Sequence, residues 1–180
     1  MRSFDKTLHA VEPGPVPHDF PPHLAPFLSI DKERFIGAPR ITRAANASGL
    51  KPARLPSHAG LPLVPLRVEG HRDRYVASLD EHGVGVFEVH DPTRLVGSYC
   101  NFGSAGSTLV VDRAHRRQGI GTEMLYRWRV LFPLAPNADV RTRQAQSLQL
   151  RVWERIQAEV RAARALAIAE HAAPVQSTRP

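Results

Sequence analysis

The sequence predicts a mixed α/β fold of the α+β kind. It combines a largely antiparallel sheet with flanking helices, an irregular proline-rich N-terminal segment and a long C-terminal helix. Prolines crowd the first third of the chain, short apolar runs between turn residues fill the middle, and apolar residues recur at helical spacing towards the end. We therefore divide the chain into a proline-rich segment (1–65), a core (66–142) and a C-terminal helix and tail (143–180).

The proline-rich segment is expected to hold few long regular elements. Proline fixes its own φ and restricts the residue before it, so a run such as Pro21-Pro22 interrupts both helices and strands. Short helical turns are predicted near Pro22–Ile30 and Thr42–Leu50, and the rest of the segment is expected to be extended or mobile.

The first half of the core is predicted to form an antiparallel meander. Short apolar or alternating runs are separated by residues that favour turns, which is the pattern of strands joined by tight connections. The predicted strands are Arg74–Leu79, Val84–His90, Arg94–Phe102 and Thr108–Val111. The predicted turns are Glu81–Gly83, Asp91–Arg94 and Gly103–Gly106.

Two helices are predicted after the strands. Gly119–Phe132 places its apolar residues on one broad face and ends before Pro133. Arg143–His171 carries an apolar stripe at helical spacing, and its arginines lie off that stripe, where they form a solvated face or meet an acidic or nucleic-acid partner. The stripe is Leu148, Val152, Ile156, Val160, Ala163 and Ala167, and the arginines are Arg151, Arg155, Arg161 and Arg164.

Composition narrows the function classes. The net charge is +7 and lysine occurs only at Lys6, Lys32 and Lys51, so arginine supplies most of the positive charge and anionic partners are favoured. The single cysteine, Cys100, excludes an internal disulfide and is expected to be a buried structural residue. The histidines show no metal-ligand spacing, and no apolar run is long enough to span a membrane. We expect no metal site, no membrane contact and a cytoplasmic location.

The most specific motif joins a strand to a helix. The apolar run Leu109–Val111 leads through a basic turn into Gly119-Ile120-Gly121, with the spacing Arg116-x-x-Gly119-x-Gly121. The first amides of a helix have no intrahelical partner, and the helix dipole places positive charge there. A strand, a glycine-containing turn and a helix N-terminus together favour the binding of a phosphate-bearing cofactor.

This pattern resembles the acyl-CoA-binding motif of the GCN5-related N-acetyltransferase (GNAT) superfamily, in which Gln/Arg-x-x-Gly-x-Gly/Ala follows the fourth strand. Leu95-Val96-Gly97 stands where that family has an apolar-Val-Gly triplet, so the likeness spans Val84–Thr122. The resemblance implies a GNAT-like sheet, acetyl-CoA (CoA) as cofactor and transfer of an acetyl group to a primary amine. The implied cofactor-binding residues are Leu109, Val110, Val111, Arg116, Arg117, Gln118, Gly119, Ile120, Gly121 and Thr122.

The family reaction needs a base, an acid and a group that polarises the thioester carbonyl. Glu88 or His90 is the candidate base, acting directly or through water. Tyr99 and Tyr126 are the candidate acids, although Tyr126 at this spacing also fits the core. A backbone amide near Leu109–Val111 is the candidate that polarises the carbonyl.

The chain also departs from the family pattern. Only Glu81-His82-Gly83 separates two strands where the family has two helices, and only Asn137–Thr142 is available as a fifth strand. Trp153 stands where the family often has a tyrosine that protonates the leaving thiolate. A non-catalytic CoA-binding module, or a protein- or nucleic-acid-interaction module on a degenerate GNAT fold, is therefore the alternative. The acceptor (a protein amine, an aminoacyl-tRNA or a small amine) and a homodimer through the C-terminal helix stay open.

Overall fold

A five-stranded antiparallel sheet forms the base of the molecule in the computed structural model, which describes residues 20–36, 62–101, 107–135 and 142–172. The strands follow one another in space as they do in sequence, so the sheet is a simple meander with β1 and β5 at its edges. Their bounds are β1 (Val64–Val68), β2 (His71–Asp80), β3 (Gly83–Glu88), β4 (Asp91–Asn101) and β5 (Ser107–Val111). The predicted α+β class and antiparallel meander are confirmed.

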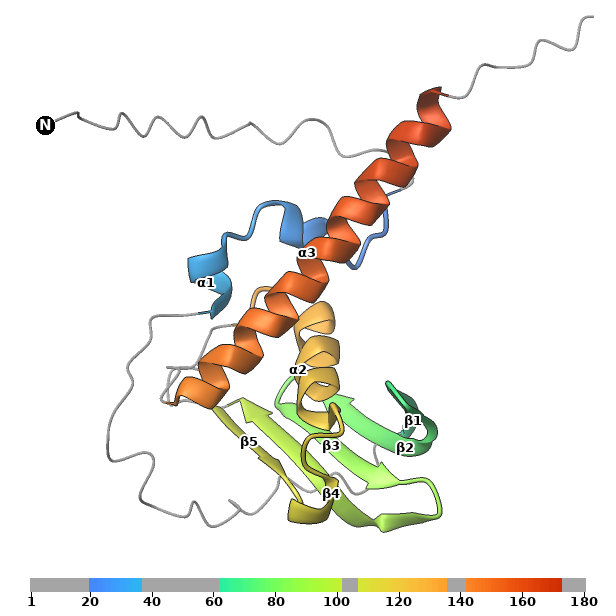
Figure 1. Cartoon of the computed structure of the whole chain (residues 1–180), viewed down its shortest axis with the longest axis vertical. Helices are drawn as coiled ribbons and strands as arrows, with labels where there is room; N and C mark the ends of the chain where they lie inside the picture. The colour runs from blue at the N-terminus through green and yellow to red at the C-terminus, as the bar shows by residue number, and fades with distance from the viewer. Residues whose placement is uncertain (1–19, 37–61, 102–106, 136–141, 173–180) are drawn as a thin grey trace, which may run out of the picture.

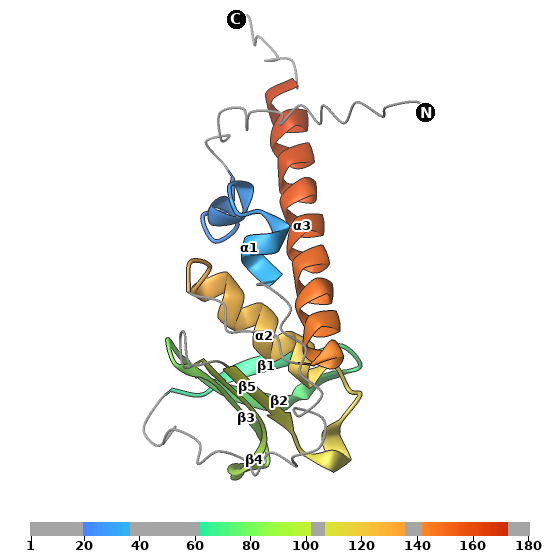
Figure 2. The ribbon, with the colours of Figure 1, turned by 90° about the vertical axis from the view of Figure 1, so that its left-hand side faces the viewer.

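The helices stack on one face of this sheet (Figures 1 and 2). One helix, α2, lies directly on the strands, and the long helix α3 crosses over α2 with its C-terminal half extending past the sheet. The short N-terminal helices pack beside α3. The helical bounds are η1 (Ala25–Leu28), α1 (Lys32–Ile36), η4 (Arg113–His115), α2 (Ile120–Leu131) and α3 (Arg143–Ala172). Both long helices match their predicted ranges to within one residue at each end.

Glycine in the middle of β4 lets α2 approach the sheet closely. A Cβ added at Gly97 would lie 3.2 Å from Ile120 Cγ2 and 3.3 Å from Met124 Cε. Two residues along the same strand face, Tyr99 packs its ring edge-on against Trp128, with 5.1 Å between ring centroids. Gly97 and Tyr99 of β4 therefore form a shallow depression, the α2 seat, into which helix α2 packs.

A second apolar layer joins α3 to the N-terminal helices. The stripe residues Val152, Ile156 and Val160 are buried, as predicted. Trp153, beside the stripe, packs on Phe35 of α1 with ring centroids 5.0 Å apart. The position where the family resemblance placed a catalytic tyrosine is thus a packing position in this chain.

The predicted turn at Asp91–Arg94 is wrong. The chain reverses at Val89 and His90, and Asp91 already pairs with Glu88 at the start of β4. The Asp91 carboxylate accepts hydrogen bonds from the Thr93 amide (3.3 Å) and hydroxyl (2.7 Å). Aspartate and proline therefore shape the first turn of the strand rather than a loop, because proline is tolerated where a strand begins.

Strand β1 was also not expected, because the irregular N-terminal segment was predicted to reach residue 65. Pro65 lies within β1, opposite Val76 of β2. An edge strand needs hydrogen bonds on one side only, so a residue without an amide proton is accommodated there. Pro22–Ile30 does contain the predicted helical turn, as η1, whereas Thr42–Leu50, Gly103–Gly106 and most of Asn137–Thr142 lie outside the described residues.

Replacing Gly97 with valine should destabilise the fold. The added methyl groups would push Ile120 and Met124 out of the α2 seat, which we expect to lower the free energy of unfolding by about 1–3 kcal/mol. Urea unfolding monitored by Trp fluorescence measures this, with the exposed Leu166→Ala variant of α3 as a control expected within about 0.5 kcal/mol of wild type. An unchanged midpoint for Gly97→Val would show that α2 does not depend on this seat.

Candidate functional site

Strand β5 presents backbone groups at the edge of the sheet. The Asp112 amide donates to the Val96 carbonyl at 2.8 Å, which identifies a hydrogen-bonded pair at the end of the β4–β5 ladder. Because such pairs alternate along an antiparallel ladder, Val110 bonds to β4, whereas the backbone groups of Leu109 and Val111 point away from it. No strand in the described part of the chain pairs with that outer edge. The structure therefore separates Val110 from the other two residues of the motif strand.

A tight basic turn connects β5 to α2. It begins with η4, where the Asp112 carboxylate accepts a hydrogen bond from the Ala114 amide at 2.9 Å. Arg117 (φ 63°) and Gly119 (φ 89°) then adopt left-handed backbone conformations, and α2 starts at Ile120. Gly119 is suited to its conformation, whereas Arg117 holds a geometry that disfavours a side chain with a Cβ.

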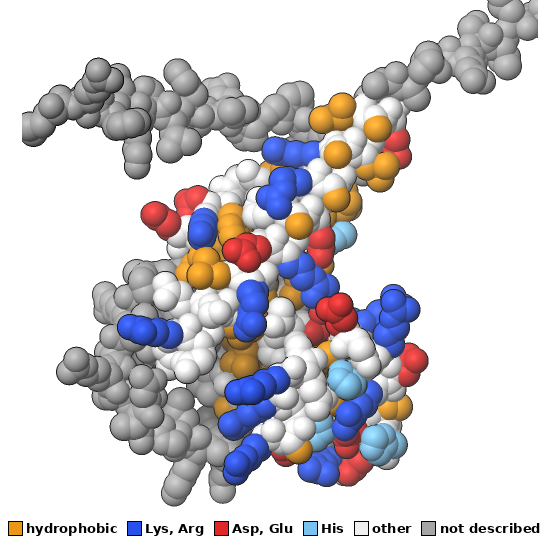
Figure 3. All heavy atoms as spheres, in the orientation of Figure 1, with side chains coloured by type: hydrophobic (Ala, Val, Ile, Leu, Met, Phe, Trp, Pro, Cys, Tyr) orange, Lys and Arg blue, Asp and Glu red, His pale blue; other side chains and the backbone are white. Residues whose placement is uncertain are grey.

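Positive charge surrounds the start of α2. Arg116 and Arg117 are exposed, and Arg116 Nε donates to the outward Val111 carbonyl at 3.0 Å, so one cation is fixed beside the edge of β5. Figure 3 shows basic side chains gathered on the face that carries β5 and the beginning of α2. The free first-turn amides and these guanidinium groups form a donor set that fits an anion such as a diphosphate.

Packing and backbone conformation explain why the two motif positions, Gly119 and Gly121, are glycines. A Cβ on Gly121 would lie 3.3 Å from Leu109 Cδ2, so this glycine lets α2 pack closely on β5. A Cβ on Gly119 would make only an ordinary contact, 3.4 Å from Val68 Cγ1 of β1, so this glycine is explained by its positive φ. The fit to an anion depends on amides and arginines instead.

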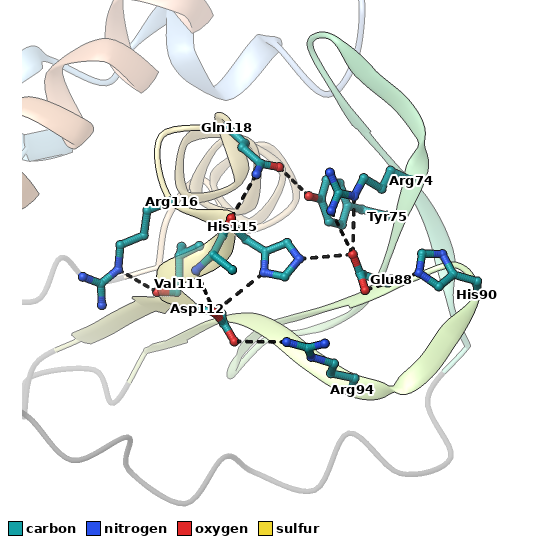
Figure 4. Close-up of polar contacts among 11 residues, drawn as sticks. Arg74, Tyr75, Glu88, His90, Arg94, Val111, Asp112, His115, Arg116 and Gln118 are labelled. Atoms are coloured by element: carbon teal, nitrogen blue, oxygen red, sulfur yellow. Dashed lines mark hydrogen bonds and ion pairs between the residues drawn. The ribbon is translucent and has the colours of Figure 1, made fainter.

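Glu88 is the centre of a charged cluster that anchors the turn (Figure 4). Its Oε1 accepts hydrogen bonds from Arg74 Nη2 at 3.1 Å and pairs with His115 Nε2 at 3.1 Å, and Oε2 lies 3.4 Å from His90 Nε2. The hydrogen bond from His115, assisted by that from Arg74, lowers the pKa of the Glu88 carboxyl against the opposing effect of burial. Glu88 is thus held as a carboxylate at the end of β3.

His115 links this cluster to the motif strand. It is buried, and while Nε2 faces Glu88, Nδ1 lies 3.8 Å from Asp112 Oδ1. Asp112 also lies 3.9 Å from Arg94 Nη2. The backbone hydrogen bond from Ala114 is the main reason why the pKa of Asp112 is lowered. The ring of His115 therefore hydrogen-bonds the Glu88 carboxylate of β3 and lies near the Asp112 carboxylate at the end of β5, to which Nδ1 makes no hydrogen bond.

Gln118 supports the turn from inside. Its Oε1 accepts a hydrogen bond from the Tyr75 hydroxyl at 2.6 Å, and its Nε2 donates to the Ala114 carbonyl at 3.2 Å (Figure 4). Burial raises the pKa of Tyr75. Both polar atoms of the Gln118 side chain are therefore already hydrogen-bonded within the protein, although Gln118 was predicted to bind the cofactor.

The four candidate catalytic side chains do not meet at one point. Glu88 and His90 lie near the turn that precedes α2, whereas Tyr99 of β4 is buried against Trp128 of α2. Burial raises the pKa of Tyr99. Tyr126 instead turns towards α3, where its hydroxyl donates to Glu159 Oε2 at 2.6 Å. Burial and that carboxylate raise the pKa of Tyr126 to about 12.

Arg155 of α3 contacts α2 rather than solvent alone. Its Nη1 bonds Glu123 Oε2 at 2.6 Å, its Nε bonds Glu159 Oε1 at 3.3 Å, and its guanidinium carbon lies 3.5 Å from the centroid of the Tyr126 ring. Glu123 also accepts from Arg127 Nε at 3.1 Å. This network fixes α3 on α2. Helical spacing alone placed Arg155 in solvent because the partners lie on another helix.

Sequence reasoning missed the anchoring side chains Arg74, Arg94 and Asp112. Arg74 lies in β2, Arg94 lies in β4 and Asp112 follows β5, and only the register of the meander brings them together (Figure 4). Asp112 carried one usable signal, since an aspartate directly before a short helical turn is a common capping residue. The two arginines carried none, because a charged residue at a strand end is ordinarily solvated.

Comparisons of the chain with protein family models, with curated proteins and with solved structures found no match. Within the described residues, no group of three or more histidine, cysteine, aspartate or glutamate side chains is arranged to hold a metal ion. None of the helices described is both long and apolar enough to cross a membrane. The geometry of β5, the turn and α2 is therefore the basis for assigning a function.

Replacing Glu88 with glutamine should lower thermal stability in a pH-dependent way. Because the folded protein lowers the pKa of Glu88, its contribution to stability is complete above the ordinary carboxyl value of 4.5 and is lost as the pH falls through the lowered value. We expect the difference in Tm between wild type and Glu88→Gln to be largest at neutral pH and to shrink in acid. The exposed Glu154→Gln variant is the control. A constant difference across the acid range would contradict the anchoring role.

Proposed function

We propose that this protein is an N-acetyltransferase that transfers an acetyl group from acetyl-CoA to a primary amine. One observation carries the proposal: the motif strand β5 is an edge strand, and it ends directly at a basic turn and the N-terminus of α2. A linear cofactor with a phosphate group at one end and an acyl group at the other can then lie along the strand while its phosphates meet the helix.

The donors on this path match the two ends of such a molecule. The first-turn amides of α2 and the exposed Arg117 suit the diphosphate, whose negative charge the helix dipole also favours. The outward backbone groups of Leu109 and Val111 suit the amide-rich pantetheine arm and the acyl carbonyl. Acetyl-CoA supplies the acetyl group in activated form, as a thioester.

The backbone amide of Leu109 or Val111 is the chain's means of stabilising the negative charge that develops on the carbonyl oxygen. A fixed amide donor aimed at a developing oxyanion contributes about 2.7–4 kcal/mol in well-studied enzymes. Both residues are held by the ladder to β4, and Val111 is held again by Arg116 on its carbonyl. The donors are therefore positioned before any substrate binds.

Of the two candidate bases, Glu88 and His90, His90 is the better candidate. The lowered pKa of Glu88 makes its carboxylate a weak proton acceptor, and both of its oxygens already have cationic or imidazole neighbours. The His90 side chain is exposed and lies 3.4 Å from Glu88 Oε2, which can orient the ring. We assign Glu88 a positioning role towards His90 and the turn.

A non-catalytic CoA-binding module is the second candidate. The observation that favours it is the separation of the catalytic candidates, since the Tyr126 hydroxyl donates to Glu159 of α3 and Tyr99 is buried against Trp128 of α2. Such a module would use the same turn and helix to bind CoA and would present the basic face to a protein or nucleic-acid partner. The positive charge of the chain equally suits an anionic acceptor such as an aminoacyl-tRNA.

Binding of CoA and acetyl-CoA, measured by calorimetry, tests the shared part of both candidates. Arg117→Asn should weaken binding about tenfold, because it removes a charged phosphate donor. Asparagine tolerates a left-handed backbone, so the free energy of unfolding should change by less than about 1 kcal/mol. Arg164→Gln on α3 removes the same charge far from the turn and should leave binding unchanged.

Two outcomes would contradict this assignment. One is the absence of CoA binding by the folded wild-type protein, and the other is an equal effect of Arg117→Asn and Arg164→Gln. The second outcome would indicate that CoA affinity depends only on the net charge of the protein. The effect of both variants on CoA binding should then disappear as the salt concentration rises.

Turnover of acetyl-CoA with a panel of amines separates the enzyme from the binding module. If the protein is an enzyme, Tyr126→Phe should retain kcat within about twofold, because a hydroxyl with a pKa of about 12 that already donates to Glu159 is a poor proton donor. His90→Gln should lower kcat/KM. CoA binding without turnover of any amine would favour the module.

A further inference from the structure

An apolar pocket lies at the edge of the sheet opposite β5, between the sheet and α2. It has a volume of about 270 Å³ and opens between the first two strands and the C-terminal half of α2. Val64 of β1, Ala77 and Leu79 of β2, and Val130 and Leu131 of α2 contribute its apolar walls. Because β1 and β5 are the two edges of the sheet, this pocket is separate from the proposed CoA path.

The polar side chains that line the pocket direct their polar atoms elsewhere. The Tyr126 ring faces the pocket while its hydroxyl donates to Glu159, and the Arg127 stem lines it while its Nε donates to Glu123. A guest therefore finds apolar surface inside the pocket and a guanidinium group at one side. Arg127 is the one charged residue among the lining residues that the structure describes.

Exposed apolar side chains concentrate around this opening. Val64 and Leu131 line the pocket and are 41% and 56% exposed, and Leu63 and Leu134, close to them in sequence, are 44% and 70% exposed. Three further exposed residues lie elsewhere: Val89 in the turn between β3 and β4, and Leu166 and Ile168 on the projecting half of α3, where Figure 3 shows hydrophobic side chains. Exposed apolar side chains that border a pocket indicate a binding site, whereas isolated ones do not.

The edge of β1 argues against an added β-strand as the guest. Pro65 is the second residue of β1 and has no amide proton to offer a further strand, so backbone pairing on that edge is interrupted. The size of the pocket favours a small guest as well. A cavity of about 150 Å³ lined by aliphatic side chains accepts benzene, so this one has room for a chain of about six to eight carbons.

We propose that this pocket binds a medium-chain aliphatic carboxylate, with the chain between β1, β2 and α2 and the carboxylate against the guanidinium of Arg127. The chain length follows from the volume, and the apolar character follows from walls that offer no free hydrogen-bonding group to the interior. The anionic end follows from Arg127, whose terminal nitrogens remain available for a second carboxylate when Nε binds Glu123.

Calorimetric titration of the full chain with sodium octanoate tests this site. We expect saturable 1:1 binding with a Kd on the order of 0.1–1 mM, which is typical for about ten heavy atoms. Ala77→Leu fills the pocket from the sheet and should abolish saturable binding. Val130→Phe fills it from α2 and replaces Ala77→Leu if circular dichroism shows that variant to be unfolded.

The contribution of Arg127 is tested with a change of headgroup. Arg127→Gln should weaken octanoate about tenfold and leave 1-octanol unchanged, and n-octylamine should bind the wild type more weakly than octanoate. Leu166→Ala, which removes an exposed apolar side chain of α3 that does not line the pocket, is the control and should not alter octanoate binding.

Three results would overturn the proposal: non-saturable uptake of octanoate by the wild type, octanoate affinity unchanged in both filled variants, or equal affinity for octylamine and octanoate. Octanoate binding should also be unaffected by saturating CoA, because the two sites lie at opposite edges of the sheet. The pocket assignment therefore stands or fails independently of the acetyltransferase proposal.

Discussion

The packing of α2 on the sheet is the contact on which the rest of the structure depends. Gly97 and Gly121 remove two Cβ atoms from this interface, one from β4 and one from the helix, so that the helix axis lies close to the strands. The remaining faces of α2 then become the platform for α3, through Tyr126 and Glu123, and for the N-terminal helices, through Arg129. Moving α2 outward would separate three layers at once, because it is the element that all of them share.

The seat of α2 also determines where its N-terminus lies. The turn before the helix is tied to β3 through His115 and Glu88, to β2 through Tyr75 and to the end of β5 through Asp112. These contacts use buried or partly buried charge, whose desolvation is offset by close opposite charges and hydrogen bonds. The result is an anion-attracting helix end with a fixed position relative to the backbone of β5. The same contacts explain why Glu88 is better suited to anchoring than to proton abstraction.

Local patterns predicted the long elements because they depend on spacing alone. The stripe from Val152 to Val160 and the alternation in β3 are sufficient to predict a helix and a strand, and both are present. Contacts that depend on register were out of reach. Arg129 is an example: in sequence it is one more arginine of a basic chain, yet in the structure it is buried between Phe35 and Trp128 and donates to the carbonyls of Phe35 and Ala135. Nothing in a helical pattern distinguishes it from an exposed arginine, because its acceptors lie on other segments.

The two ends of α2 offer different chemistry for a physical reason. At the N-terminus unpaired amides and the helix dipole select anions, whereas at the C-terminal half Val130 and Leu131 meet apolar strands and select a hydrocarbon surface. A helix of 12 residues is about 18 Å long, so ligands at the two ends do not touch. Coupling between them would require α2 to shift as a rigid body. The glycine seat and the ion pair of Glu123 with Arg155 of α3 oppose such a shift, so the geometry favours two sites that bind independently on one helix.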